Sequence, residues 1–178
     1  LNAFTAKLFV ERREPSSMLF RLGYRRGLSL FSQCDSQKLM EYDYIIAGAG
    51  AAGLSLLHYL LEDEALSQKR ILLLDKEQKS ENDRTWCFWE KGESPFEELL
   101  AAKWDRLQFH SPDFSDTLHI APYQYKMLRS KDFYSFCLKK IEHFTNVEYR
   151  QTHIREIRED GTVDCGKQCY TGRYVFSS

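Results

Sequence analysis

The glycine-rich segment Gly48–Gly53 constrains the fold of this chain more than any other feature. It has the spacing G-x-G-x-x-G and follows the short apolar segment Tyr42–Ala47. Ala51–Glu62 then carries leucines at helical spacing, and Arg70–Leu74 is a second apolar segment, closed by Asp75. A strand, a glycine turn, a helix and a second strand ending in an acid make up the βαβ unit that binds dinucleotides.

Each position of this motif has a physical role in such a unit. Gly48 permits the tight turn, Gly50 lets the backbone approach a pyrophosphate, and Gly53 lets helix and strand pack closely. Amides at the helix start favour the negative phosphates. Asp75 lies 22 residues after Gly53 and can accept hydrogen bonds from the adenosine ribose hydroxyls. The alternative is a glycine turn between buried elements that binds nothing.

The distance to the next parallel strand favours FAD over NAD, which stays the alternative. About 70 residues separate Asp75 from Val147, whereas an NAD-type domain reaches its third strand soon after the second. A hairpin over residues 153–164, before Tyr174–Phe176, is typical of the β-meander in FAD-binding folds. We therefore predict an α/β, Rossmann-like FAD-binding fold: a parallel sheet with a β-meander and an inserted substrate-facing β/α segment, incomplete at the C-terminus because the sequence stops within a strand.

The inserted segment has its own element signals. Ser94 as cap and Glu97 as its partner predict a short helix. Apolar residues predict a second helix, capped by Ser130. Trp104–His110 and Thr117–Ala121 are expected to be strands that pair with each other across residues 111–116. A short strand is expected at Val147–Tyr149, and Phe133, Phe136 and Phe144 are expected in the core.

Composition narrows the class of protein. The chain of 178 residues is 43% hydrophobic and 29% charged, as in soluble globular proteins, and its net charge of −1 gives no reason to expect a nucleic-acid partner. The uncharged run Tyr44–Leu61 is better explained by a strand and a helix than by a membrane span. Five cysteines without C-x-x-C spacing or grouped histidines predict no metal site and fit a reducing, cytosolic setting.

The first 39 residues differ from the rest. They carry seven Lys or Arg against three acids and show no clear periodicity. We divide the chain into residues 1–39, an N-terminal extension, and residues 40–178, the N-terminal part of an FAD-binding domain with the start of a substrate region. Translation from Met40 is the preferred explanation of the extension; a targeting peptide and an ordinary disordered extension are the alternatives.

A second constellation is Asn82–Trp89, which reads Asn-Asp-Arg-Thr-Trp-Cys-Phe-Trp. Aromatic faces stabilise positive charge, so this density suits a hydrophobic substrate that forms a cation. The alternative is a surface loop that enters an aromatic core segment. His58 lies away from the phosphate end of the motif, and we do not expect it to be catalytic.

The chain resembles bacterial lycopene cyclases. The similarity covers residues 40–178 and rests on Gly48–Ser55, Asp75-Lys76, Asn82–Trp89, Arg129–Tyr134 and Tyr174–Ser178. It implies a flavoprotein of carotenoid biosynthesis, an isomerase that closes the ψ-ends of lycopene into β-rings and gives γ-carotene and then β-carotene. An acid protonates the terminal double bond, a carbocation forms, the ring closes and a proton leaves. The resemblance also implies reduced FAD, with NADPH or NADH as electron source, and association with the inner face of the cytoplasmic membrane.

Carried over by position, the resemblance also assigns residues. Gly48, Gly50, Gly53 and Asp75 would bind FAD, and Lys76 and Arg129 would lie near the adenine-side phosphates or ribose. Asp83, Arg84 and Trp86 would face the flavin or the polyene end. The catalytic acid is expected downstream of Ser178, so the chain alone is expected to be inactive. An FAD-dependent monooxygenase or polyprenyl reductase, and a non-catalytic dinucleotide-binding fragment, are the competing functions.

Overall fold

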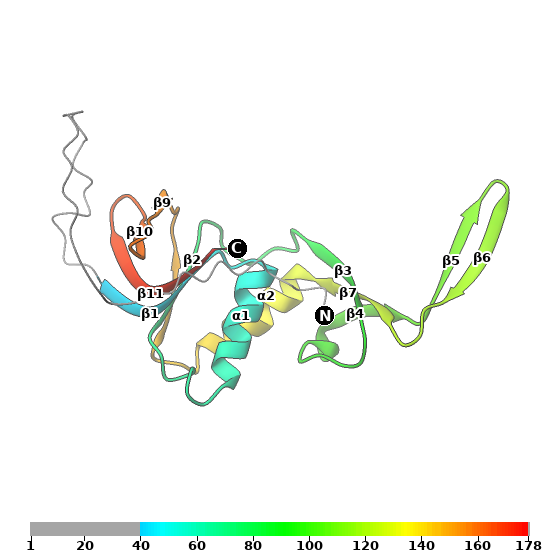
Figure 1. Cartoon of the computed structure of the whole chain (residues 1–178), viewed down its shortest axis with the longest axis horizontal. Helices are drawn as coiled ribbons and strands as arrows, with labels where there is room; N and C mark the ends of the chain where they lie inside the picture. The colour runs from blue at the N-terminus through cyan, green and yellow to red at the C-terminus, as the bar shows by residue number, and fades with distance from the viewer. Residues whose placement is uncertain (1–39, 178) are drawn as a thin grey trace, which may run out of the picture.

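The computed structural model describes residues 40–177, so the expectation for residues 1–39 lies outside its range. Figure 1 shows a large sheet, two helices packed beside it, a smaller sheet beyond the helices and a hairpin that projects from the smaller sheet. The predicted mixed α/β architecture is confirmed, and most strands of the large sheet are parallel.

The large sheet has six strands in the order β8-β2-β1-β11-β10-β9. The first four are parallel to one another, and β10 and β9 pair antiparallel at the other edge. The predicted strands over 42–47, 70–74, 147–149 and 174–176 are all present, with shifted ends. Their bounds are β1 Met40–Ala47, β2 Ile71–Asp75, β8 Val147–Gln151, β9 Glu156–Ile157, β10 Thr162–Asp164 and β11 Cys169–Ser177.

Both faces of the central strands are buried, which explains why they read as continuous apolar runs. Ile46 and Leu73 face the helices, and Ile45 and Leu72 face a second cluster with Val163 from the β9–β10 hairpin. Each of these side chains is fully buried, and such burial stabilises the fold by about 1.5–3 kcal/mol per side chain.

Helix α1 (Ala51–Glu62) has the predicted bounds. Leu54, Leu57, Leu60 and Leu61 are all buried against the sheet and α2. The uncharged run Tyr44–Leu61 is therefore divided between β1 and α1. Neither helix in the part of the chain that the structure describes is long and apolar enough to cross a membrane.

Helix α2 (Ser130–Ile141) lies beside α1 and corrects one prediction. Ser130 does not cap the helix: Arg129 holds the cap position, and Ser130 is the first helical residue. The reason is that the fully buried Ser130 hydroxyl binds a distant loop, residues 81–84, where it donates to Asp83 Oδ1 at 2.8 Å. The helix places Phe133 in the core, with Phe136 and Phe144 packed against it, as predicted.

The smaller sheet has the antiparallel order β3-β7-β4, with bounds β3 Thr85–Glu90, β7 Gln124–Arg129 and β4 Leu100–Trp104. The aromatic run 86–89 is thus a strand, so its residues alternate between two faces. Trp86 and Phe88 face the helices, while Cys87 and Trp89 are exposed.

The helix predicted at Ser94 is wrong. Only a single 3-10 turn, Glu97–Leu99, forms there, and no hydrogen bond of the Ser94 hydroxyl exists among the described residues. Glu97 instead pairs with Lys126, whose fully buried ammonium lies 2.6 Å from it and 3.0 Å from Glu90. Leaving the buried Lys126 ammonium without a carboxylate partner would cost more free energy than leaving the helix start without a cap.

The projecting hairpin consists of β5 Arg106–Ser111 and β6 Phe114–His119. The pairing of these segments was predicted with residues 111–116 as the connection. In the structure the paired strands reach Ser111 and Phe114, so only residues 112 and 113 connect them. Figure 1 shows this hairpin reaching away from the rest of the molecule.

Candidate dinucleotide site

The turn after β1 depends on two of its three glycines for internal reasons. Gly48 has a φ of 119°, a conformation that other residues rarely adopt. A Cβ on Gly53 would lie 1.9 Å from the Gly48 carbonyl oxygen, because the first turn of α1 packs directly on the loop. These are the turn and packing roles expected from the sequence.

Gly50 is different, because no atom of residues 40–177 explains it. A Cβ built there meets none of the described residues within 4 Å, and its φ of −79° is open to any residue. No side chain caps α1 at Gly50, and its first turn holds no acid. Gly50, Ala51 and Ala52 at the helix start line a cavity, which suits an anionic ligand that approaches the backbone too closely to leave room for a side chain.

A cavity of about 600 Å³ lies at this helix start and at the carboxyl ends of β1 and β2. Its wall includes the glycine loop, the segment after β2, the start of β3, Tyr134 of α2, and residues 152–154 after β8. This is the edge of an open parallel sheet at which α/β proteins bind their ligands.

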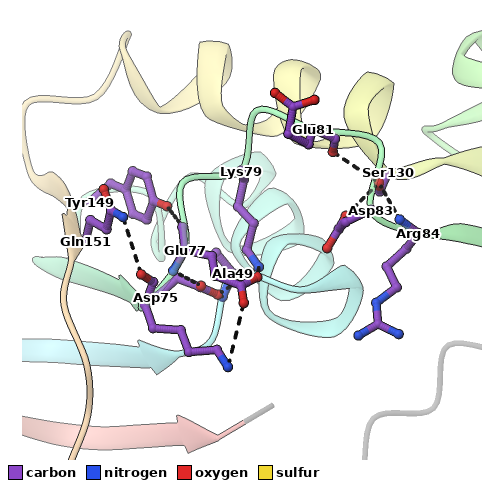
Figure 2. Close-up of polar contacts among 11 residues, drawn as sticks. Ala49, Asp75, Glu77, Lys79, Glu81, Asp83, Arg84, Ser130, Tyr149 and Gln151 are labelled. Carbon is purple, nitrogen blue, oxygen red and sulfur yellow. Dashed lines mark hydrogen bonds and ion pairs between the residues drawn. The ribbon is translucent and has the colours of Figure 1, made fainter.

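Asp75 closes β2 and fixes the glycine loop. Its Oδ2 accepts the Ala49 N–H at 2.7 Å, and its Oδ1 accepts the Glu77 N–H at 2.8 Å. Figure 2 shows this carboxylate beside Lys79, whose Nζ lies 3.3 Å from Oδ2. Oδ1, with the Glu77 N–H as its partner, can accept a further hydrogen bond, so contact with a ribose hydroxyl stays a prediction that this geometry permits.

Lys79 is a cavity residue that sequence reasoning missed. Its side chain is only 9% exposed and lies over the Tyr134 ring, 5.5 Å from the ring centroid. The nominated Lys76 also lines the cavity, but its side chain is 67% exposed and pairs with Glu77. The i,i+4 spacing of Asp75 and Lys79 was the available signal.

Ser130 holds the loop that carries Asp83 and Arg84. Its hydroxyl donates to Asp83 Oδ1, and its oxygen accepts the Arg84 N–H at 3.0 Å, as Figure 2 shows. The bond from Ser130 holds the pKa of Asp83 below its usual value. Burial, aided by the Asp83 carboxylate, raises the pKa of the Tyr134 hydroxyl to about 12. Asp83 is therefore an anion and Tyr134 a neutral phenol near neutral pH.

Most nominated residues meet at this cavity. Gly48, Gly50, Asp75, Lys76, Asp83, Arg84 and Trp86 all line it. Trp86 is half-buried and packs edge-on against Phe133 and Tyr134, at centroid distances of 5.6 and 5.8 Å.

Two nominated residues stand apart. Gly53 lies behind the cavity, in the first turns of α1. Arg129 is exposed at the end of β7 and is not among the described residues of the cavity wall, so its proximity to phosphate or ribose stays a prediction. Thr152 and His153 in the wall were not nominated; they follow β8, whose position beside β2 is what brings them there.

His58 is also placed by the structure. It is buried in α1 between Phe96 and Phe136, and burial followed by the nearby Lys140 ammonium lowers its pKa. It lies outside the described cavity wall, and the expectation that it is not catalytic stays a prediction. Within residues 40–177, no group of three His, Cys, Asp or Glu side chains is placed to hold a metal ion.

Comparisons with solved structures show a fold shared with flavoproteins. The structure of PqsL, a probable FAD-dependent monooxygenase from Pseudomonas aeruginosa, matches with a TM-score of 0.51 and 16% identity, over 77% of this chain and 40% of that one. PqsL from P. aeruginosa in complex with 2-aminobenzoylacetate matches with a TM-score of 0.53 and 17% identity, over 77% and 41%. The chain thus spans about two fifths of the length of these structures.

Comparisons of the sequence itself give a family. No curated protein matches the chain significantly. The family model described as lycopene cyclase protein matches residues 43–178, which include the glycine loop, Asp75, the segment 82–89 and all of β11. This match extends over most of the chain, which therefore belongs to the lycopene cyclase protein family.

Proposed function

We propose that this chain is the FAD-binding part of a lycopene cyclase that closes the ψ-ends of lycopene into β-rings. The observation that carries the proposal is the shared cavity: Asp83, Arg84 and Trp86 line the same space as the glycine loop. Family membership supports lycopene as the substrate class, and this geometry supports a flavin bound beside the aromatic segment.

The residues present fit the pyrophosphate and adenosine end of FAD. Gly50 leaves room where backbone amides would meet phosphate, and Asp75 keeps acceptor capacity for a ribose. Lys76 and Lys79 supply positive charge at the same wall, with Arg129 as a further candidate. FAD-dependent monooxygenases share the fold, which supports FAD rather than NAD.

The chain's own residues would prepare the cavity for cation chemistry. Asp83 stays ionised because Ser130 donates to it, so it offers fixed negative charge rather than a proton. Trp86 presents an aromatic ring held by Phe133 and Tyr134, and ring faces attract positive charge. When bound, reduced flavin would add negative charge beside a developing carbocation, an electrostatic form of catalysis without net redox change. NADPH or NADH would keep the flavin reduced.

The substrate implies a place in the cell. Lycopene is a hydrocarbon that dissolves in membranes, so we place the protein at the inner face of the cytoplasmic membrane, held peripherally.

Pigment analysis tests the proposal. The complete reading frame that encodes this chain is expressed in lycopene-accumulating bacteria, and carotenoids are separated by chromatography. We expect lycopene to be replaced by γ-carotene and β-carotene. Unchanged lycopene, in cells where the protein is folded and carries flavin, would refute cyclisation.

A flavin-dependent monooxygenase is the second candidate, because the PqsL structures share the fold. The two functions differ in redox balance. A monooxygenase consumes one reduced nicotinamide for each oxygen atom inserted and a polyprenyl reductase one for each double bond reduced, whereas a cyclase needs it only to keep the flavin reduced. Nucleotide consumption in step with product would therefore favour the redox enzyme.

A further inference from the structure

We infer that the outer face of the small sheet binds the polyene chain of the substrate, with Trp89, Tyr125 and Trp104 as positioning residues. This inference rests on the proposed function and extends it, because Asp83, Arg84 and Trp86 account only for one end of a long substrate. The outer face is the surface of β3-β7-β4 that points away from the helices.

Strand register assembles this face from three separate segments. Trp89 of β3 and Trp104 of β4 each pair with Tyr125 of β7. The three rings therefore form one row across the sheet, with centroid distances of 5.0 Å from Trp89 to Tyr125 and 6.0 Å from Trp104 to Tyr125. Both tryptophans stay exposed, at 44% and 41%. Such exposure of large rings in a row is unusual on a surface that binds nothing.

The rest of the face is uncharged up to its far end. The next row holds Cys87, Met127 and Ala102, and the last holds Thr85 and Arg129. The one acid and the two lysines of the same strands point to the opposite side. There Lys126 pairs with Glu90, and Lys103, which lies opposite Lys126 in the register, pairs with Glu97. A neutral face of rings, thioether and methyl groups matches a neutral hydrocarbon in charge as well as in polarity.

This face adjoins the candidate dinucleotide cavity. Thr85 directly follows Arg84, which lines that cavity. From Thr85 to Trp89 the strand advances about 13 Å, at about 3.3 Å per residue. Beyond the aromatic row a second cavity of about 640 Å³ opens, lined by Trp104, Tyr125 and Leu107 together with the polar residues Asp105, Arg106, Gln108 and Thr117. A linear apolar molecule can therefore run from the dinucleotide site along β3 and across the rings, as far as the apolar edge of this cavity.

Other occupants fit less well. An anionic membrane surface would call for basic residues, but the adjoining hairpin carries Asp113 and Asp116 near its tip and one arginine, Arg106. The hairpin has exposed apolar residues of its own, Phe109 and Phe114. We assign the polyene to the aromatic row and use Phe109 as a comparison site.

The test measures polyene binding separately from flavin binding and from turnover. The complete reading frame is purified with FAD and mixed with lycopene in detergent micelles. Cys87, an exposed free thiol in the row beside the rings, reports occupancy through its rate of alkylation. We expect lycopene to slow alkylation of Cys87 at least fivefold in the wild type. Mass spectrometry of the Cys87 peptide separates it from the other thiols.

Variants assign the effect to the rings. Trp89→Ala and Trp104→Ala should raise the lycopene concentration for half-maximal protection at least tenfold, and Trp89→Phe should restore most of the loss. Bound FAD per protein should stay within twofold of the wild type. Tyr59→Ala is the matched control, because Tyr59 is an equally exposed ring, at 50%, on α1.

Each outcome separates the two proposals. A wild type that cyclises lycopene while Trp89→Ala and Trp104→Ala retain full affinity would overturn this inference and leave the proposed function standing. A wild type that holds FAD but neither protects Cys87 nor cyclises lycopene would overturn both. Binding to vesicles is also measured without lycopene. If it falls in the tryptophan variants but not in Phe109→Ala, the face is a membrane contact, and this result would also overturn the inference.

Discussion

Replacing Gly53 by alanine should destabilise the protein, whereas the same change at Gly50 should not. In Gly53→Ala the new Cβ lies 1.9 Å from the Gly48 carbonyl oxygen, and real Cβ atoms essentially never come within 3.0 Å of a neighbour. The helix start or the turn must therefore move by about 1.1 Å. The obstacle is backbone, so no side-chain rotation relieves it.

The magnitude follows from two opposing effects. Overpacking of this kind costs about 1–3 kcal/mol or more, and alanine is about 1 kcal/mol better than glycine within a helix. Because a rigid carbonyl group must shift, we expect a net loss near the upper end, about 2 kcal/mol. For a domain of this size, that loss lowers Tm by about 4–8 °C.

Gly50→Ala should separate ligand binding from stability. Its Cβ meets no atom of the part of the chain that the structure describes within 4 Å, so the free energy of unfolding should change by less than about 0.5 kcal/mol. The added methyl group occupies the space where phosphate would approach the loop, and FAD affinity should fall at least tenfold.

The assay is urea unfolding of the FAD-free protein, followed by tryptophan fluorescence, together with FAD titration of each variant. Removal of FAD matters because a bound ligand adds its own stabilisation. Equal stability of Gly53→Ala and wild type would refute the packing argument. Normal FAD affinity in Gly50→Ala would refute the assignment of the open space to phosphate.

Three further changes probe other contacts. Lys126→Met leaves two carboxylates without their buried partner and should cost about 3–5 kcal/mol in urea unfolding. Burial would raise the pKa of Glu97, but hydrogen bonds led by the one from Lys126 outweigh it and lower the pKa. The stabilisation from this pair is therefore present above the ordinary carboxyl pKa and lost as pH falls below about 4.5. An unfolding series from pH 7 to 3 in which the free energy of unfolding of Lys126→Met changes with pH as in the wild type would contradict this. Ser130→Ala removes the bonds to Asp83 and to the Arg84 amide and should cost about 1–3 kcal/mol, with a rise in the pKa of Asp83 visible by NMR; an unmoved pKa would show that Ser130 is not its cause. Asp75→Asn should weaken FAD binding at least tenfold in titration, and unchanged affinity would remove the ribose contact from the proposal.

Sequence reasoning succeeded where one local signal determined the structure. The glycine spacing and the leucine stripe predicted α1 to the residue, because turn and helix follow from neighbouring positions. The parallel strands were recognisable because burial on both faces leaves an unbroken apolar run.

The errors share one physical cause: a polar side chain with a distant partner. Ser130 and Glu97 both occupy positions that local rules assign to helix starts, yet each binds a group more than 25 positions away, Asp83 and Lys126. No window of sequence contains both partners. Likewise the density of aromatics at 86–89 was noted, but only the register with β7 shows that Trp86 faces the cavity side and Trp89 the outer face.

The pairing of β1 with β11 has a consequence for how the protein is made. Tyr44 lies beside Tyr174, 130 positions further along the chain. During synthesis β1 emerges early, but its neighbour on that side does not exist until more than a hundred further residues have been added. One edge of β1 therefore stays unpaired while the rest of the chain is synthesised, and unpaired strand edges are prone to aggregate. Slow, late closure of the sheet makes yield in the cell depend on chaperones and growth temperature.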